Sequence, residues 1–120
     1  MEANEQQNKA LKLLKEYRLV LWRKSALEVI PDANNKSLLI CLERIRLTKE
    51  LVESLKGNMR TGEKMFWILH TTFMTEKQPG DVEEILADIA GKFEKISRRT
   101  YFRLKKQAIK KFSEYQISVK

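Results

Sequence analysis

Apolar residues recur along the first half of the chain at the spacing of amphipathic helices. In residues 5–26 they follow one another at intervals of three and four positions, which predicts a long helix that buries much of its surface. Turn-forming residues fill positions 31–35 and predict a loop. A second amphipathic helix is predicted over residues 36–56, and Gly57 is well placed to end it.

The second half of the chain begins with another helical segment. Residues 61–74 are apolar on nearly every side, which is typical of a central core helix. Pro79 and Gly80 then break the pattern. Asp81 and Glu84 follow at the spacing of a capping box, which predicts the start of a fourth helix of about three turns.

A short turn at residues 94–96 leads to Ser97, which is predicted to cap a fifth helix extending to about Tyr115. No segment alternates apolar and polar residues as a half-buried strand does. We therefore predict an all-α fold of about five helices, in which a C-terminal helix-turn-helix packs on a helical N-terminal part. The predicted division falls between residues 1–78, which support the core, and residues 79–120, which bind DNA.

The positive charge is concentrated in the last quarter of the chain. Residues 1–91 hold 14 basic and 14 acidic side chains, whereas residues 92–120 hold 10 basic and 2 acidic ones. The formal net charge of +8 therefore lies entirely in the final segment. Such segregation is typical of proteins that bind a polyanion, because neutralised phosphates release their counterions.

Within the fifth helix the charges also lie on one face. Apolar residues at i, i+3, i+7 and i+11 predict an inward stripe of Tyr101, Leu104, Ala108 and Phe112. Basic residues at i, i+4, i+7 and i+11 predict a ridge on the opposite side, formed by Arg99, Arg103, Lys106 and Lys110. We therefore predict a helix-turn-helix that binds double-stranded DNA sequence-specifically and places residues 98–113 in the major groove.

The candidate contact residues fall into two groups. The N-terminal half of such a helix usually meets base edges, and arginine suits bidentate contact with guanine; the candidates there are Arg98, Arg99 and Arg103. Ser97 and the free amides at the helix start are predicted to hold a phosphate. Further phosphate contacts are predicted for Lys92, Lys95, Lys106, Lys110 and Lys111.

The same region resembles known helix-turn-helix families. Ile89-Ala90, Phe93, the run from Ile96 to Tyr101 and Ala108 resemble the pattern of sigma-factor region-four-like domains. Residues 100–103 and 108–112 are more similar to ArpU-type phage late transcriptional regulators. This resemblance covers residues 81–115 and implies a small prophage-encoded activator that acts at promoters and contacts RNA polymerase. The turn before Ser97 is one residue longer than in the sigma-like pattern, so the resemblance leaves open which arginine reaches which base.

Other classes of function find less support in the sequence. His70 is the only histidine, and no catalytic or phosphate-loop motif is present, which argues against an enzyme. Cys41 is the only cysteine, so one chain forms neither a disulfide nor a Cys-based zinc site. We predict no cofactor and no metal. The polar start of the chain and the lack of a long apolar run favour a cytoplasmic protein without a membrane segment.

The sequence leaves open two alternative functions, and it also predicts a partner for the N-terminal helices. A phage DNA-packaging or replication accessory, similar to a small terminase subunit, would bind DNA as an oligomer. A basic helix on a membrane surface would bind anionic lipid in place of DNA. The N-terminal helices also carry more apolar residues than one narrow stripe buries, which predicts a homodimer; these residues are Leu11, Leu13, Leu14, Val20, Leu21 and Trp22.

Overall fold

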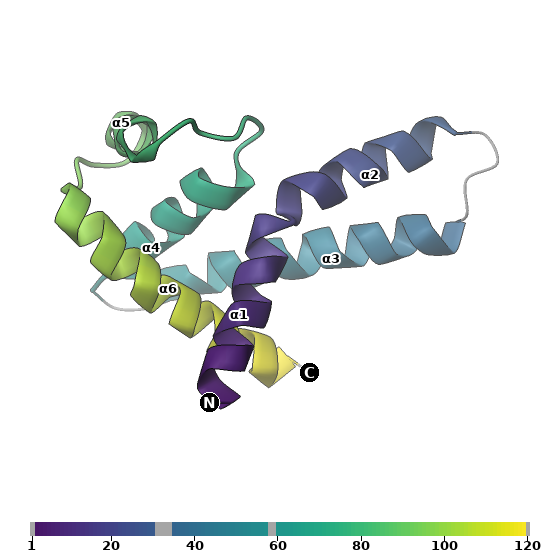
Figure 1. Ribbon diagram of the computed structural model, residues 1–120, viewed down its shortest axis with the longest axis horizontal. Coiled ribbons are helices and arrows are strands. Elements are labelled where there is room, and N and C mark those ends of the chain that lie inside the picture. The colour runs from purple at the N-terminus through teal and green to yellow at the C-terminus, as the bar shows by residue number, and fades with distance from the viewer. Residues whose placement is uncertain (1, 31–34, 58–59, 120) are drawn as a thin grey trace.

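The computed structural model describes residues 2–30, 35–57 and 60–119. All regular structure in these ranges is helical, which confirms the all-α prediction, with six α-helices in place of about five. Figure 1 shows their arrangement, in the order α1 (Glu2–Lys15), α2 (Tyr17–Val29), α3 (Asn35–Ser54), α4 (Gly62–Leu69), α5 (Val82–Lys92) and α6 (Arg98–Val119).

The prediction of one continuous helix over residues 5–26 is wrong, because the chain bends at Glu16. This residue separates α1 from α2 with φ −87° and ψ −3°, although its N–H still donates to the Lys12 carbonyl at 3.0 Å. Its carboxylate accepts a hydrogen bond from Arg44 on α3 at 2.9 Å. The bend lets α1 pack on α6 while α2 packs on α3.

Two short helical turns extend the predicted helices. A 3-10 turn, Leu55–Gly57, follows α3, and a π-helical turn, His70–Met74, follows α4. Arg18 on α2 holds the end of the π turn, since its Nε donates to the Thr75 carbonyl at 2.8 Å and its Nη2 to the Thr72 carbonyl at 3.2 Å. The Arg18 guanidinium therefore connects α2 to the π turn that follows α4.

The main core lies where α1, α4 and α6 meet. The predicted central helix α4 contributes Met65, Ile68 and Leu69, all at most 2 % exposed. A second, smaller apolar cluster joins α2 to α3 through Tyr17, Val20, Cys41 and Ile45. Among the helices of the described ranges, none combines the length and apolar character needed to cross a membrane.

Candidate nucleic-acid interface

The C-terminal helices start at well-formed caps. Asp81 is the N-cap of α5, as predicted, and its side chain accepts a hydrogen bond from the Glu84 N–H at 2.9 Å. Glu84 reaches back and accepts from the Gly80 N–H at 2.6 Å. Because both contacts satisfy backbone donors near the helix start, they fix where α5 begins.

The turn between α5 and α6 is anchored on α4. Phe93 ends α5 with its N–H bonded to the Ile89 carbonyl at 2.8 Å, and its ring stacks on Trp67 with 6.0 Å between centroids. Ile96 is buried. The Ser97 side chain accepts from the Thr100 N–H at 3.1 Å, which confirms the predicted cap of α6.

One face of α6 is fully packed. The predicted inward stripe is confirmed, because no member is more than 1 % exposed: Tyr101, Leu104, Ala108 and Phe112. The Tyr101 hydroxyl also lies 2.9 Å from the Thr72 hydroxyl of the π turn. Buried packing and this hydrogen bond together fix the rotation of α6 about its own axis, and Figure 1 shows the helix crossing the body of the protein with α5 steeply inclined to it.

The opposite face of α6 carries what we call the basic ridge. It consists of four exposed cations, as the sequence predicts: Arg99, Arg103, Lys106 and Lys110. Within the described residues, no ridge side chain takes part in an ion pair or a side-chain hydrogen bond. Positive charge is therefore displayed along the ridge without internal neutralisation.

The other candidate cations differ in how far they are neutralised. Arg98 pairs with Glu83 on α5 at 2.6 Å, and Lys92 pairs with Asp88 at 3.1 Å. Lys111 lies 3.6 Å from Glu114. Lys95 is exposed in the turn. Three of these candidates therefore share their charge with a carboxylate, unlike the cations of the ridge.

Lys105 is a basic residue of α6 that lies outside the ridge. Its ammonium sits 5.7 Å from the Phe73 ring centroid and 5.8 Å from that of Tyr101. Burial lowers the pKa of the Lys105 ammonium, and the charge of Lys15 lowers it further. Helical spacing accounts for the contact between Lys105 and Tyr101, because Lys105 follows Tyr101 by one turn of the helix.

Phe102 lies at the edge of the inward stripe of α6, which predicts packing against the helix of residues 61–74; this prediction is wrong. The Phe102 side chain is 46 % exposed, and the Arg98 guanidinium lies 5.6 Å from its ring centroid. Such a ring offers an apolar contact beside the ridge, of the kind that thymine methyl groups accept. The spacing of Phe102 one residue after the inward Tyr101 was the available signal, because one residue corresponds to about 100° of rotation.

The exposed cations of the basic ridge suit the binding of an extended anion. Among the described residues, no group of three His, Cys, Asp or Glu side chains gathers closely enough to hold a metal ion. The pKa of His70 is lowered, chiefly by burial, and its ring stacks on Phe66 with 5.5 Å between centroids. That histidine is therefore a packed boundary residue of the π turn.

Comparison with known proteins identifies no relative: no family model, no curated protein and no solved structure matches the chain.

Proposed function

We propose that this protein is a transcriptional regulator that binds double-stranded DNA sequence-specifically by laying α6 in the major groove. The observation that carries the proposal is the basic ridge, whose four cations lack internal partners in the described structure and stand opposite a face that is fully packed. A helix of 10–12 Å diameter fits a major groove about 12 Å wide.

The length of the ridge matches a short stretch of duplex. From Arg99 to Lys110 the helix rises by roughly 16 Å at 1.5 Å per residue, which corresponds to about five base pairs at 3.4 Å each. Arg99 and Arg103 in the N-terminal half are the proposed base-reading residues, because their planar guanidinium groups bind guanine in a bidentate manner. Lys106 and Lys110 are the proposed phosphate contacts.

The remaining candidates have supporting roles in this proposal. Lys92, Lys95 and Lys111 contact phosphates beside the groove, and the exposed start of α6 at Ser97 offers backbone amides to another phosphate. Arg98 is held by Glu83 in the free protein, so its proposed contact with a base edge requires that this ion pair first breaks. The resemblance to phage late regulators makes a promoter the proposed target and RNA polymerase a proposed partner.

The test compares single substitutions on a DNA site selected from random duplexes and on unselected DNA. Arg99→Ala and Arg103→Ala are each expected to cost about 1–3 kcal/mol on the selected site, with a smaller loss on unselected DNA. Lys110→Ala is expected to weaken both DNAs equally and to reduce the salt slope by about one. Binding is followed by fluorescence anisotropy of labelled duplexes at several salt concentrations.

Lys49→Ala is the matched control, because Lys49 is an exposed lysine on α3 whose side chain makes no ion pair in the described part of the chain. It is expected to leave binding to both DNAs unchanged. Equal losses on selected and unselected DNA for Arg99→Ala, Arg103→Ala and Lys110→Ala would show that α6 does not read bases. Failure to enrich any site from random duplexes would also reject a sequence-specific regulator.

A further inference from the structure

The hairpin formed by α2 and α3 carries most of the exposed apolar surface. Seven of the eight large apolar side chains that are exposed in the described ranges lie on or next to these two helices. The most exposed are Val29 at 78 %, Trp22 at 67 % and Leu39 at 64 %. Figure 1 shows the two helices running side by side and projecting from the rest of the molecule.

Apolar residues occupy every side of α2. Val20 is buried against α3, Leu21 packs partly against the same cluster, and Trp22 and Leu19 are exposed. Charged residues are interspersed among them. Within the described residues α2 packs mainly on α3, with fewer contacts to α1 and the π turn, and this packing leaves Leu19 and Trp22 exposed.

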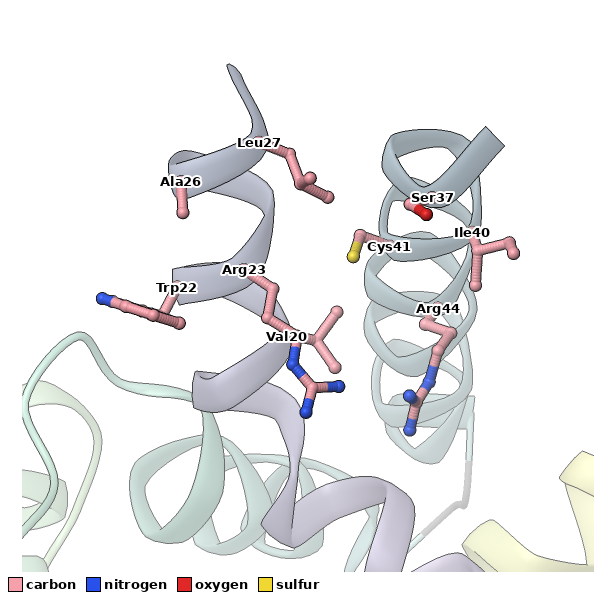
Figure 2. Close-up of a pocket in the computed structure, with 9 residues that line it drawn as sticks. All are labelled: Val20, Trp22, Arg23, Ala26, Leu27, Ser37, Ile40, Cys41 and Arg44. Carbon is pink, nitrogen blue, oxygen red and sulfur yellow. The ribbon is translucent and has the colours of Figure 1, made fainter. Parts of the chain in front are cut away.

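A groove runs between the two helices on one face of the hairpin. It has a volume of about 370 Å³, within the size range of pockets that enclose small ligands. Figure 2 shows Leu27 and Cys41 pointing into the space between the helices, whereas Trp22 lies at the rim and points away from it. Ala26 and Ile40 also line the groove, together with three polar residues, Arg23, Ser37 and Arg44.

The charges of the hairpin are largely balanced. Residues 16–54 hold 7 basic and 6 acidic side chains, in contrast to the basic C-terminal segment. Several are paired within the hairpin region: Lys24 with Glu28, Arg44 with Glu16, and Arg46 with both Glu43 and Glu50. Two copies of this surface would therefore not repel each other strongly, and the surface has no excess charge to attract a polyanion.

We propose that the hairpin is a dimerisation surface and that its partner is a second copy of this chain. Trp22 of each copy enters the groove between α2 and α3 of the other. A two-fold dimer needs one patch that is complementary to itself, and this patch combines an exposed aromatic side chain with a groove whose lining is apolar in six of nine residues. Two helical hairpins paired in this way form a four-helix arrangement.

The exposed apolar surface of the hairpin approaches the area of a standard dimer interface. At roughly 100 Å² for each exposed side chain, the seven apolar residues present roughly 700 Å² in total, against roughly 800 Å² per partner in a standard interface. Trp22 and Ile40 are the members of this set that line the groove, so they form the centre of the proposed contact. The structure also narrows the predicted dimer surface, because Leu14 and Val20 are buried within the chain and only Trp22 of the six predicted residues is largely exposed.

Sedimentation velocity between about 1 and 100 μM tests the proposal without DNA. The wild-type protein is expected to sediment as a dimer, at twice the chain mass of 14.2 kDa. Trp22→Glu removes the aromatic anchor and Ala26→Arg fills the groove, and each is expected to weaken dimerisation by at least about 30-fold, as for a central anchor residue. Circular dichroism of each variant verifies that the helices still form.

Phe102→Ser is the matched control, because Phe102 is a large apolar residue that is exposed on α6, outside the hairpin; the variant is expected to remain dimeric. A wild-type monomer at 100 μM would overturn the proposal, as would a dimer that Trp22→Glu and Ala26→Arg leave intact. Co-sedimentation of a monomer with phosphatidylglycerol vesicles, lost in Trp22→Glu, would assign the hairpin to a membrane surface and also overturn it. None of these three results bears on DNA binding by α6.

Discussion

At the residue scale, the distinction between neighbouring cations depends on whether a carboxylate lies within reach. Arg98 and Arg99 are adjacent in the sequence, yet Arg98 pairs with Glu83 at 2.6 Å and Arg99 makes no ion pair in the described structure. The partner lies 15 positions away on another helix, so spacing within α6 does not reveal it. Glu83 is therefore expected to restrain the contribution of Arg98 to DNA binding.

This restraint leads to a prediction for Glu83→Gln. The substitution removes a negative charge beside the ridge and frees Arg98, so we expect DNA binding to tighten by up to about fivefold, the equivalent of an exposed ion pair worth about 1 kcal/mol. Titration of labelled duplex by fluorescence anisotropy measures the change. Glu53→Gln is the control, since Glu53 is an exposed glutamate of α3 that is paired with Lys56. Unchanged or weaker binding by Glu83→Gln would contradict this role.

At the element scale, the features that could be predicted are those encoded by local chemistry. The caps at Asp81 and Ser97 depend on side chains within three residues of the amides they bind, and the inward stripe of α6 depends only on helical period. The bend at Glu16 has no proline or glycine to mark it. It follows from tertiary contacts, because α1 and α2 pack on different helices.

The exposure and pairing of individual residues also depend on tertiary contacts, so the sequence does not predict them. The periodicity of α6 predicts the ridge and its opposite face, but not that Arg98 is paired across the turn or that Arg18 bonds to carbonyls more than 50 positions away. Likewise, the apolar richness of residues 5–26 predicts burial without showing that Leu14 is covered within the chain and Trp22 is not. These outcomes depend on which elements meet.

The π turn after α4 provides a pH-dependent prediction. Burial lowers the pKa of His70 below its ordinary value of 6.5, and the charge of Lys92 lowers it further, whereas Asp88 and Glu53 oppose the shift and Lys56 adds to it. The folded protein therefore binds fewer protons at His70 than the unfolded chain does. Stability from this source is complete above pH 6.5 and decreases as pH falls below that value.

Urea unfolding at several pH values between 8 and about 5 tests this prediction. The free energy of unfolding of the wild type is expected to fall more steeply below pH 6.5 than that of His70→Gln, which lacks the titrating ring. The comparison concerns the slopes, because the loss of stacking between His70 and Phe66 shifts the variant by a constant amount. Parallel pH profiles for the two proteins would contradict the assignment.

At the scale of the whole molecule, the two proposed surfaces lie far apart. Figure 1 places the start of α6 and the turn after α5 at one side of the molecule and the far end of the α2–α3 hairpin at the other. Arg18 connects α2 to the end of the π turn, and Glu16 at the bend connects the start of α2 to α3 through Arg44. A dimer formed through the hairpins would therefore leave both ridges free, as DNA with two half-sites requires.

The central claim is that the ridge, and not the overall positive charge, binds DNA. Its most direct test is the dependence of the DNA dissociation constant on salt concentration for two variants that lose equal charge. One carries Arg99→Gln, Arg103→Gln and Lys106→Gln on the ridge. The other carries Lys9→Gln, Lys12→Gln and Lys49→Gln, at exposed lysines of α1 and α3 whose side chains make no ion pair in the described residues.

Each phosphate contact that is lost reduces the slope of log K against log salt by about 0.9. The ridge variant loses one proposed phosphate contact, at Lys106, and two proposed base contacts, so we expect its slope to fall by about 0.9 and its affinity to be largely lost. The α1 and α3 variant is expected to keep the wild-type slope and affinity. Equal reductions of slope and affinity in both variants would contradict the claim, because binding would then follow net charge alone.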